Sequence, residues 1–418
     1  MSEKTFRIGP IRPPSEANSL LIQVTNGCTW NKCRFCQLYR HTKFKAYSAD
    51  SIRADIDNIA YWAERVRKYQ CKGIPGADDR GAAGSGASGN SGNDRGAAGS
   101  GVSWDIDGIN AELSALADDE ERQCMYTVAN WLLAGGENVF LQDGNSTALS
   151  SGRLTDVLVY LRQVFPQIKR ITSYGRAENL SRSTAEDYAE LKAAGLDRIH
   201  SGFESGSDAV LARINKGVTQ EQQIRAGQAV KAGGIELSIY FMPGVGGKDL
   251  SASNAEGTAE VINAVDPDFV RVRTAAIKPG TELYQDWQEG KFALCSDDDK
   301  VREIRRVIEL AEEGLTTYLV SDHMINLLQN VEGYLGISGS AHQRSGKTRL
   351  LRQIDRYLDL LDADRRVFQL LRRTLRAYDL DDMDRLGSIE RERLRAEIMK
   401  ETELGWDVRM NGYICRYV

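Results

Sequence analysis

Short apolar segments alternate with helical segments over most of this chain, and that alternation constrains its fold more than any other feature. Capping boxes that begin at Ser183 and Thr219 open two of the helical segments, which end at Gly195 and Gly233. The six segments expected to be strands are residues 20–25, 138–142, 168–173, 196–201, 235–242 and 269–274. Strands that are joined by helices imply a parallel sheet with right-handed crossovers.

Six such strand–helix units are too few to close an eight-stranded barrel, so this order predicts an open form of it. We expect an α/β fold with a partial (β/α)6 TIM-like barrel and with ligands at the carboxyl ends of its strands. From about residue 299 the apolar spacing becomes helical, with many Arg and Asp residues, which predicts a helical C-terminal extension. The expected division is a barrel over residues 1–298 and a helical region over residues 299–418.

The barrel sequence is interrupted by residues 73–103, which consist mainly of Gly, Ala and Ser and contain the segment DRGAAGSG twice. Such residues bury too little surface to offset the entropy lost on ordering. We therefore expect a flexible surface insertion. A tolerated loop is the simplest interpretation, and a substrate lid is the alternative.

The charge balance and the hydropathy exclude two classes of protein. The chain has 418 residues, with 54 Lys and Arg against 59 Asp and Glu, and a formal net charge of −5. This is not the balance of a protein that binds nucleic acid through its overall charge. The sequence has no apolar run of about 18 residues and no apolar signal core at its N-terminus, so we expect a cytoplasmic protein without membrane contact.

Three cysteines crowd together just after the first expected strand. Cys28, Cys33 and Cys36 are separated by four residues and then by two. Three thiolates on one loop can hold three corners of an iron–sulfur cluster, which leaves one iron open to a ligand. A zinc site with His41 as the fourth ligand, in a zinc-stabilised binding protein without catalysis, is the alternative. The position of the loop at the carboxyl end of a barrel strand favours the iron–sulfur cluster.

The cysteine cluster resembles that of the radical S-adenosylmethionine (SAM) superfamily. The usual spacing there is three residues and then two, with an aromatic residue before the last cysteine, a position that Phe35 occupies here. The sequence from about residue 10 to about residue 330 resembles members of one branch of the superfamily, which contains the Elongator catalytic subunit and coproporphyrinogen oxidase-like enzymes. The segments that carry this resemblance are PPSEANSLLIQVTNGCTW, KFKAYS, LQDGNS, SYGRAENL, SGFESGSDAVL, MPGVGG and KPGTELY.

The resemblance implies two cofactors, a 4Fe–4S cluster and SAM. Cys28, Cys33 and Cys36 would ligate the cluster, SAM would chelate its unique iron, and Phe35 would lie near the adenine. The residues that would bind SAM follow the later strands: Asp143, Gly144, Asn145, Arg176, Glu204 and Gly244.

Each of these strand-end residues has an implied role. Asp143 and its two neighbours take the place of the Gly-Gly-Glu motif of the family and would accept from the amino group of the methionine moiety. Arg176 would pair with the methionine carboxylate. Glu204 would contact the ribose hydroxyls or the amino group. The loop that contains Gly244 would leave room for the adenine or the methionine moiety.

The implied reaction is reductive cleavage of SAM to a 5′-deoxyadenosyl radical, which abstracts hydrogen from an unidentified substrate. An electron donor such as flavodoxin or ferredoxin is the implied partner. A porphyrinogen oxidase-like decarboxylase is one alternative, although Gln37-Leu38 stands where that type of enzyme has a further cysteine. A methylthiotransferase-like enzyme is another, although the extra cluster cysteines that it would need are not visible.

The remaining histidines and cysteines give weaker signals. His200 lies on an expected strand, where a substrate contact inside the barrel is one possible role, whereas a structural role is expected for His323. The four other cysteines show no paired spacing and are expected to be free thiols: Cys71, Cys124, Cys295 and Cys415.

Overall fold

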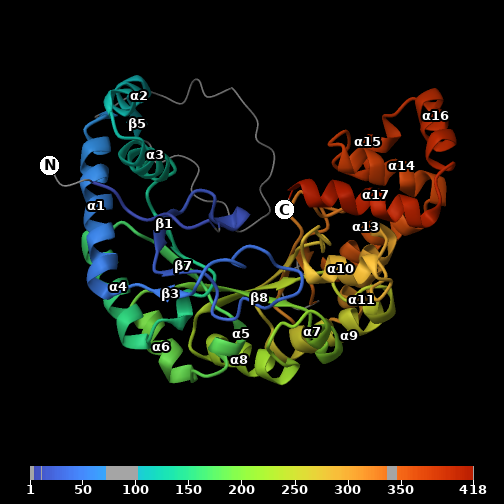
Figure 1. Cartoon of the computed structure of the whole chain (residues 1–418), viewed down its shortest axis with the longest axis horizontal. Coiled ribbons are helices and arrows are strands. Elements are labelled where there is room, and N and C mark those ends of the chain that lie inside the picture. The colour runs from blue at the N-terminus through green and yellow to red at the C-terminus, as the bar shows by residue number, and fades with distance from the viewer. Residues whose placement is uncertain (1–3, 11, 72–101, 337–345, 418) are drawn as a thin grey trace. The chain divides into compact units, whose positions relative to one another are not determined.

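A computed structural model describes residues 4–10, 12–71, 102–336 and 346–417 (Figure 1). Its main sheet has eight strands in the order β1-β6-β7-β8-β9-β10-β11-β12. Their bounds are β1 Leu20–Gln23, β6 Asn138–Gln142, β7 Arg170–Tyr174, β8 Arg198–Glu204, β9 Glu236–Phe241, β10 Phe269–Val272, β11 Tyr318–Val320 and β12 Gly333–Tyr334. The first six are the six strands expected from the sequence, so the α/β class is confirmed.

The pairing of these strands is that of an open barrel. β1 with β6, β6 with β7, β9 with β10 and β10 with β11 pair in parallel, whereas β12 runs antiparallel to β11. The two end strands of the order, β1 and β12, are not neighbours, as a partial barrel requires. β11 and β12 come from the region expected to be helical, because strands of two or three residues are too short to show a period.

The chain divides into two compact units. The first comprises residues 1–29, 42–175 and 186–199, and the second comprises residues 30–41, 176–185 and 200–418. The main helices of the first unit are α1 Ala49–Arg67, α2 Ile106–Ala115, α3 Asp119–Leu133, α4 Ser151–Val164 and α6 Ala185–Ala193. α6 begins at Ala185, so Thr184 rather than Ser183 precedes its first turn. α1 packs its apolar face, which includes Ile56 and Trp62, against α3 and α4 (Figure 1).

The ends of the glycine-rich insertion lie side by side. β4 (Gln70–Cys71) pairs antiparallel with β5 (Ser103–Trp104), and Cys71 lies opposite Ser103. Ser103, which the sequence placed in the insertion, therefore belongs to a strand. Residues 72–101 lie outside the described residues, so the expected flexibility of the insertion stays a prediction.

The helices of the second unit fall into two groups. Those between the strands are α5 Ala177–Leu180, α7 Asp208–Arg213, α8 Gln220–Ala232, α9 Ser251–Val265, α10 Glu282–Gln288 and α11 Asp297–Leu310. Those near the C-terminus, in red tones in Figure 1, are α13 Gly346–Leu358, α14 Asp362–Arg373, α15 Leu380–Asp384, α16 Ser388–Ile398 and α17 Glu403–Ile414. The capping box at Thr219 is formed as expected. The division at residue 298 stays a prediction, and it falls within the first turn of α11.

A buried ion pair ties the C-terminal helices to the rest of the second unit. Nη2 of Arg373, on α14, donates to both carboxylate oxygens of Asp297 at 2.9 and 3.0 Å. On α17, the side chain of Asn411 donates to the carbonyl of Ile277 at 2.9 Å and accepts from its N–H at 3.0 Å. The two contacts join residues that are 76 and 134 positions apart, and they make the C-terminal helices part of one packed unit.

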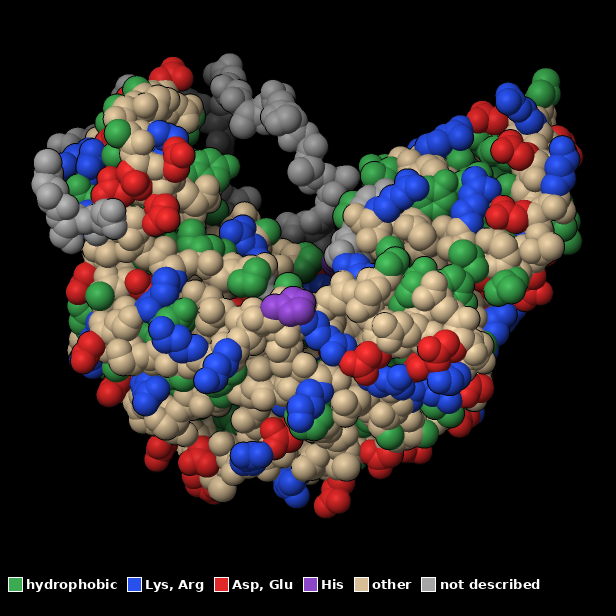
Figure 2. Space-filling model, viewed as in Figure 1, with side chains coloured by type: hydrophobic (Ala, Val, Ile, Leu, Met, Phe, Trp, Pro, Cys, Tyr) green, Lys and Arg blue, Asp and Glu red, His purple; other side chains and the backbone are tan. Residues whose placement is uncertain are grey.

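Two further observations concern the surface. Within the described ranges, the structure holds no helix that is long and apolar enough to cross a membrane. Lys and Arg side chains intermix with Asp and Glu side chains over the face that Figure 2 shows, in keeping with the near balance of charges in the sequence.

Candidate functional site

The cysteine loop leaves the sheet through a short two-stranded ribbon in the first unit. β2 (Thr25–Asn26) pairs antiparallel with β3 (Lys45–Ala46), so the chain before Cys28 and the chain after the loop run together. Gly27 has a φ of +85°, a left-handed conformation that side chains other than glycine rarely adopt. The glycine therefore sets the direction in which the chain leaves the ribbon toward Cys28.

Asp143 and Asn145, which follow β6, hold the residues on either side of Cys28. An oxygen of Asp143 accepts from the N–H of Gly27 at 3.3 Å, and the Asn145 amide donates to the Thr29 hydroxyl at 2.9 Å. Burial raises the pKa of Asp143 to about 6, although the Gly27 N–H and other donors act in the opposite direction. Two of the residues predicted to bind SAM therefore lie beside the first cysteine of the loop.

The second unit holds the remainder of the loop, with Cys33 and Cys36. The guanidinium of Arg40 donates to the carbonyls of Cys36 and Cys33 at 3.1 and 3.3 Å, and to Glu282 at 2.8 Å. The N–H of Arg34 donates to the carbonyl of Ile214 at 2.9 Å. Arg40 therefore fixes the backbone of both cysteines through their carbonyls.

The donor set fits an iron–sulfur cluster in its chemistry. Cys28, Cys33 and Cys36 are half-buried and form no disulfide with another described residue, so their thiols can exchange protons for a metal. In the part of the chain that the structure describes, no group of three or more His, Cys, Asp and Glu side chains is arranged to hold a metal ion. The assignment of the three cysteines as ligands therefore stays a prediction.

Glu204 ends β8 with a φ of +65°, and its carboxylate pairs with a residue that the sequence did not single out. Nζ of Lys216 donates to Oε1 of Glu204 at 3.0 Å. Burial lowers the pKa of Lys216, but the negative charges of Glu204 and Cys33 outweigh it, so the net shift is upward. Lys216 has no fixed spacing to the cysteines, which is why the sequence carried no signal for it.

Arg176 lies beside this pair. Its Nη2 donates to the carbonyl of Lys216 at 3.0 Å, and its guanidinium stands 5.5 Å from the centre of the Trp30 ring. The end of β8 therefore brings together Glu204, Lys216 and Arg176, and Arg176 also lies 3.9 Å from the carboxylate of Glu178.

Phe35 and Gly244 occupy a more apolar part of the second unit. Phe35 packs against a buried cluster that includes Val245 and Ile277. The N–H of Gly244 donates to Oε2 of Glu303 at 2.9 Å, and Gly244 has a φ of +84°. The buried carboxylate of Glu303 thus fixes the backbone of the loop after β9.

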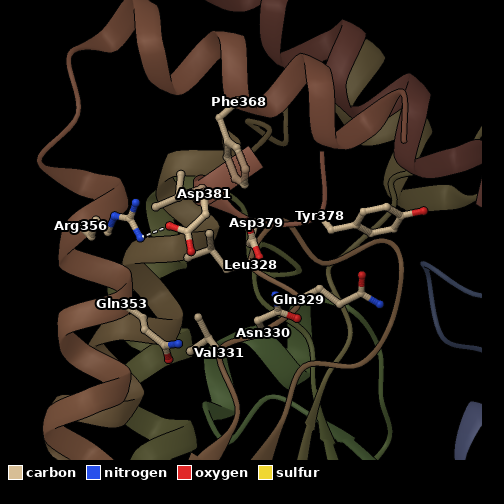
Figure 3. A pocket seen from close by; sticks show the side chains of 11 residues that line it. Leu328, Gln329, Asn330, Val331, Gln353, Arg356, Phe368, Tyr378, Asp379 and Asp381 are labelled. Carbon is tan, nitrogen blue, oxygen red and sulfur yellow. Dashed lines mark ion pairs between the residues drawn. The ribbon is translucent and has the colours of Figure 1, made fainter. Parts of the chain in front are cut away.

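A separate cavity of about 140 Å³ lies between the C-terminal helices and the segment that joins β11 to β12 (Figure 3). Residues 328–331, side chains of α13 and α14, and residues 378–381 at the start of α15 line it, and Arg356 pairs with Asp381 at 2.6 Å on its wall. None of the residues predicted to bind cofactors lines this cavity. Cys71, Cys124, Cys295 and Cys415 are free, as expected.

Comparison with known proteins identifies the class. Residues 120–252 match the family model described as the Radical SAM superfamily, a range that contains Asp143, Arg176, Glu204 and Gly244. The heme chaperone HemW of Bacillus subtilis is 22% identical over 254 residues, which cover 58% of this chain and 66% of that protein. The tRNA uridine(34) acetyltransferase of Methanocaldococcus jannaschii is 26% identical over 138 residues, which cover 31% of this chain and 25% of that protein.

Among solved structures, that of Elp3 from Methanocaldococcus infernus is 16% identical with a TM-score of 0.38 and covers 53% of each chain. Coproporphyrinogen III oxidase (HemN) from Escherichia coli is 18% identical with a TM-score of 0.34, over 41% of this chain and 39% of that one. The chain spans less than two thirds of the length of the relatives it matches.

The family match over residues 120–252 and the sequence relatives support the radical SAM superfamily, a class of enzymes, for this chain. This confirms the superfamily and the branch that the sequence resembles. Enzymes of the superfamily generally use a 4Fe–4S cluster and SAM. The superfamily match favours the iron–sulfur cluster over a zinc site in a binding protein without catalysis.

Proposed function

We propose that this chain holds a 4Fe–4S cluster through Cys28, Cys33 and Cys36 and uses SAM to remove a hydrogen atom from a substrate. When bound, the reduced cluster supplies the electron that cleaves SAM to methionine and a 5′-deoxyadenosyl radical. A small electron-transfer protein such as flavodoxin or ferredoxin would deliver that electron. The observation that carries the proposal is the arrangement of Glu204, Lys216 and Arg176 at the end of β8. Lys216 lies close enough to Cys33 for the two to interact electrostatically.

The two cations and the carboxylate suit the methionine end of SAM. Its carboxylate would pair with Arg176 or with the ammonium of Lys216, and charge-assisted hydrogen bonds of this kind are the strong ones. Lys216 would also reduce the cost of holding the thiolate of Cys33 in a partly buried place.

The remaining residues would orient the loop and the ligand. Asp143 and Asn145 hold Gly27 and Thr29, and through them the backbone of Cys28. Asp143 would in addition accept from the amino group of the methionine moiety. Phe35 would present its ring to the adenine, and the loop at Gly244 would leave space for the same ligand.

The test is anaerobic reconstitution with iron and sulfide, followed by measurement of bound iron and of 5′-deoxyadenosine formed from SAM. The wild type should bind about four irons, and a triple Cys28→Ala, Cys33→Ala, Cys36→Ala variant should bind almost none. Cys71→Ala is the matched control, because Cys71 is an exposed free thiol. Full iron content in the triple variant would contradict the assignment.

Two narrower functions within the superfamily remain alternatives, a porphyrinogen oxidase-like enzyme and a methylthiotransferase-like enzyme. Metal analysis bears on the second, because a methylthiotransferase would bind more than one cluster. Deuterium transfer from a labelled candidate substrate into 5′-deoxyadenosine would identify the substrate.

A further inference from the structure

A cluster of charged and aromatic side chains lies at the carboxyl ends of β9, β10 and β11. We call Tyr240, Arg271, Arg273, Asp322 and His323 the β10 arginine cluster. Arg273 directly follows β10, and Asp322 comes two residues after the end of β11. None of the five belongs to the cofactor site described above.

The cluster shares a face of the sheet with Glu204. His200 and Glu204 are four residues apart on β8, so their side chains point to the same face. The ring of His200 stacks on that of Tyr240 at 6.0 Å, which places Tyr240 on this face as well. Tyr240 lies opposite Arg271 in the strand register, and the guanidinium of Arg273 stands 5.3 Å from the centre of the Tyr240 ring.

Asp322 holds both arginines. Its Oδ1 accepts from Nη1 of Arg273 at 3.1 Å, and its Oδ2 accepts from Nη1 of Arg271 at 3.4 Å. The turn that carries Asp322 is itself fixed, because Oδ1 of Asn326 accepts from the N–H and the hydroxyl of Thr274 at 3.1 and 3.0 Å. The two guanidinium groups are therefore held in place before any ligand binds.

Both guanidinium groups of the cluster contact the carboxylate of Asp322. Burial, and then the charge of Arg273, lower the pKa of His323 to about 4, so this histidine is neutral at physiological pH. The positive charge beside Tyr240 therefore comes from the arginines and not from His323.

One guanidinium nitrogen of Arg273, Nη2, forms no hydrogen bond with the described residues. Nη1 of the same side chain donates to Asp322 and to the carbonyl of Val272, whereas Nη2 is buried and has no hydrogen-bond partner among the described residues. The side chain of Arg273 is 12% exposed, so bulk water has little access to it. A buried cationic donor without a partner is costly, and in a working site a ligand commonly supplies the missing acceptor.

We propose that Nη2 of Arg273 binds an oxyanion of the substrate, a carboxylate or a phosphate. The proposal rests on the proposed function, since the bound group would belong to the molecule from which hydrogen is removed. A neutral carbonyl could accept one hydrogen bond, but an oxyanion makes the stronger, charge-assisted contact with a guanidinium group. Tyr240 and Asp322 would orient the guanidinium, and the shared face would bring the rest of the substrate toward Glu204.

The experiment measures anion binding to the reconstituted full-length protein by calorimetry, with inorganic phosphate in one series and succinate in the other, at constant ionic strength. We expect the wild type to bind at least one of the two, and the tighter one indicates whether the substrate is a phosphate ester or a carboxylic acid. Arg273→Gln should weaken that binding at least tenfold. Arg305→Gln is the control, because Arg305 also pairs with a carboxylate, Asp355 at 2.7 Å, and should bind as the wild type does.

A second measurement uses the wild type alone and so does not depend on how the variant folds. Phenylglyoxal modification of Arg273, read by peptide mass, should slow at least threefold when the tighter anion is present. Binding of neither anion, or equal binding by Arg273→Gln and the wild type, would overturn the proposal. Iron content and SAM affinity are measured on the same samples, so a failed cofactor assignment is recognised separately from a failed anion site.

Discussion

The ammonium of Lys216 lies 3.0 Å from the carboxylate of Glu204, and both side chains are almost completely withdrawn from water. A buried pair of this kind contributes little net stability, because desolvation of both charges offsets their attraction. A role in ligand binding explains the presence of this pair better, because it lies at the carboxyl end of β8, where the ligands of α/β barrels bind. We therefore regard the pair as part of the SAM site rather than as a support of the fold.

Replacement of Lys216 tests this view. Lys216→Met should still bind the cluster, because the three cysteines that would ligate it are unchanged. It should weaken SAM binding by roughly tenfold to a hundredfold, the loss expected for one charge-assisted contact. Lys216→Arg should restore part of the affinity because it restores the charge. The measurement is SAM affinity by calorimetry. Lys231→Met serves as control, because Lys231 also pairs with a carboxylate, Asp268 at 2.8 Å. Wild-type affinity in Lys216→Met would place the methionine carboxylate elsewhere.

Glu303 should make the stability depend on pH. Burial raises its pKa from the ordinary 4.5 to about 7, although Ser251 and the Gly244 N–H act in the opposite direction. The folded state therefore holds this proton more tightly than the unfolded state. Its contribution to the free energy of unfolding is complete below about pH 4.5 and is lost as the pH rises through about 7, by up to about 3 kcal/mol.

Glu303→Gln removes the titrating group and keeps a side chain that can accept from Gly244. Urea unfolding at several pH values should show a flatter profile for this variant than for the wild type between pH 5 and 8. Glu309→Gln, on the same helix but half exposed, should retain the wild-type profile. If the profiles of the wild type and of Glu303→Gln have the same slope, Glu303 is ionised throughout.

Arg373→Met should be strongly destabilising, because it leaves the carboxylate of Asp297 buried without its main partner. The two side chains are 2% and 0% exposed. Loss of one partner of a buried pair costs about 3–5 kcal/mol, measured by urea unfolding. Arg306→Met removes an exposed arginine that pairs with Glu309 at 3.0 Å, and it should cost less than about 1 kcal/mol. A similar loss in both variants would mean that Asp297 is protonated or hydrated in the folded state.

The insertion should be dispensable for folding and for the cluster. β4 and β5 pair at its two ends, with Cys71 opposite Ser103, so replacement of residues 72–102 by Asn-Gly forms an ordinary two-residue hairpin turn. The melting temperature should change by less than about 4 °C, and the iron content should match that of the wild type. A variant with the same residues in scrambled order separates the effect of length from that of sequence. A larger loss of melting temperature would show that the insertion packs against the protein.

Local signals in the sequence accounted for the elements of the fold. The capping box at Thr219 and the apolar runs at residues 138–142 and 269–274 correspond to α8, β6 and β10. Each signal depends on residues within one or two helical turns, or within a few positions of a strand. It can therefore be recognised without knowledge of the rest of the chain. β11 and β12 were missed because three and two residues are too few for any period.

The sequence by itself determined the superfamily, the six alternating strands and the place of the cysteine loop after the first of them. Only the tertiary structure decided which cations face which carboxylates: Lys216 and Glu204, Arg273 and Asp322, Arg373 and Asp297. These partners lie 12, 49 and 76 residues apart. Periodicity and capping depend on residues that are close in the sequence, whereas these ion pairs form only when distant parts of the chain meet in the folded protein. Burial then makes an unpaired charge costly, so each buried charge needs a partner.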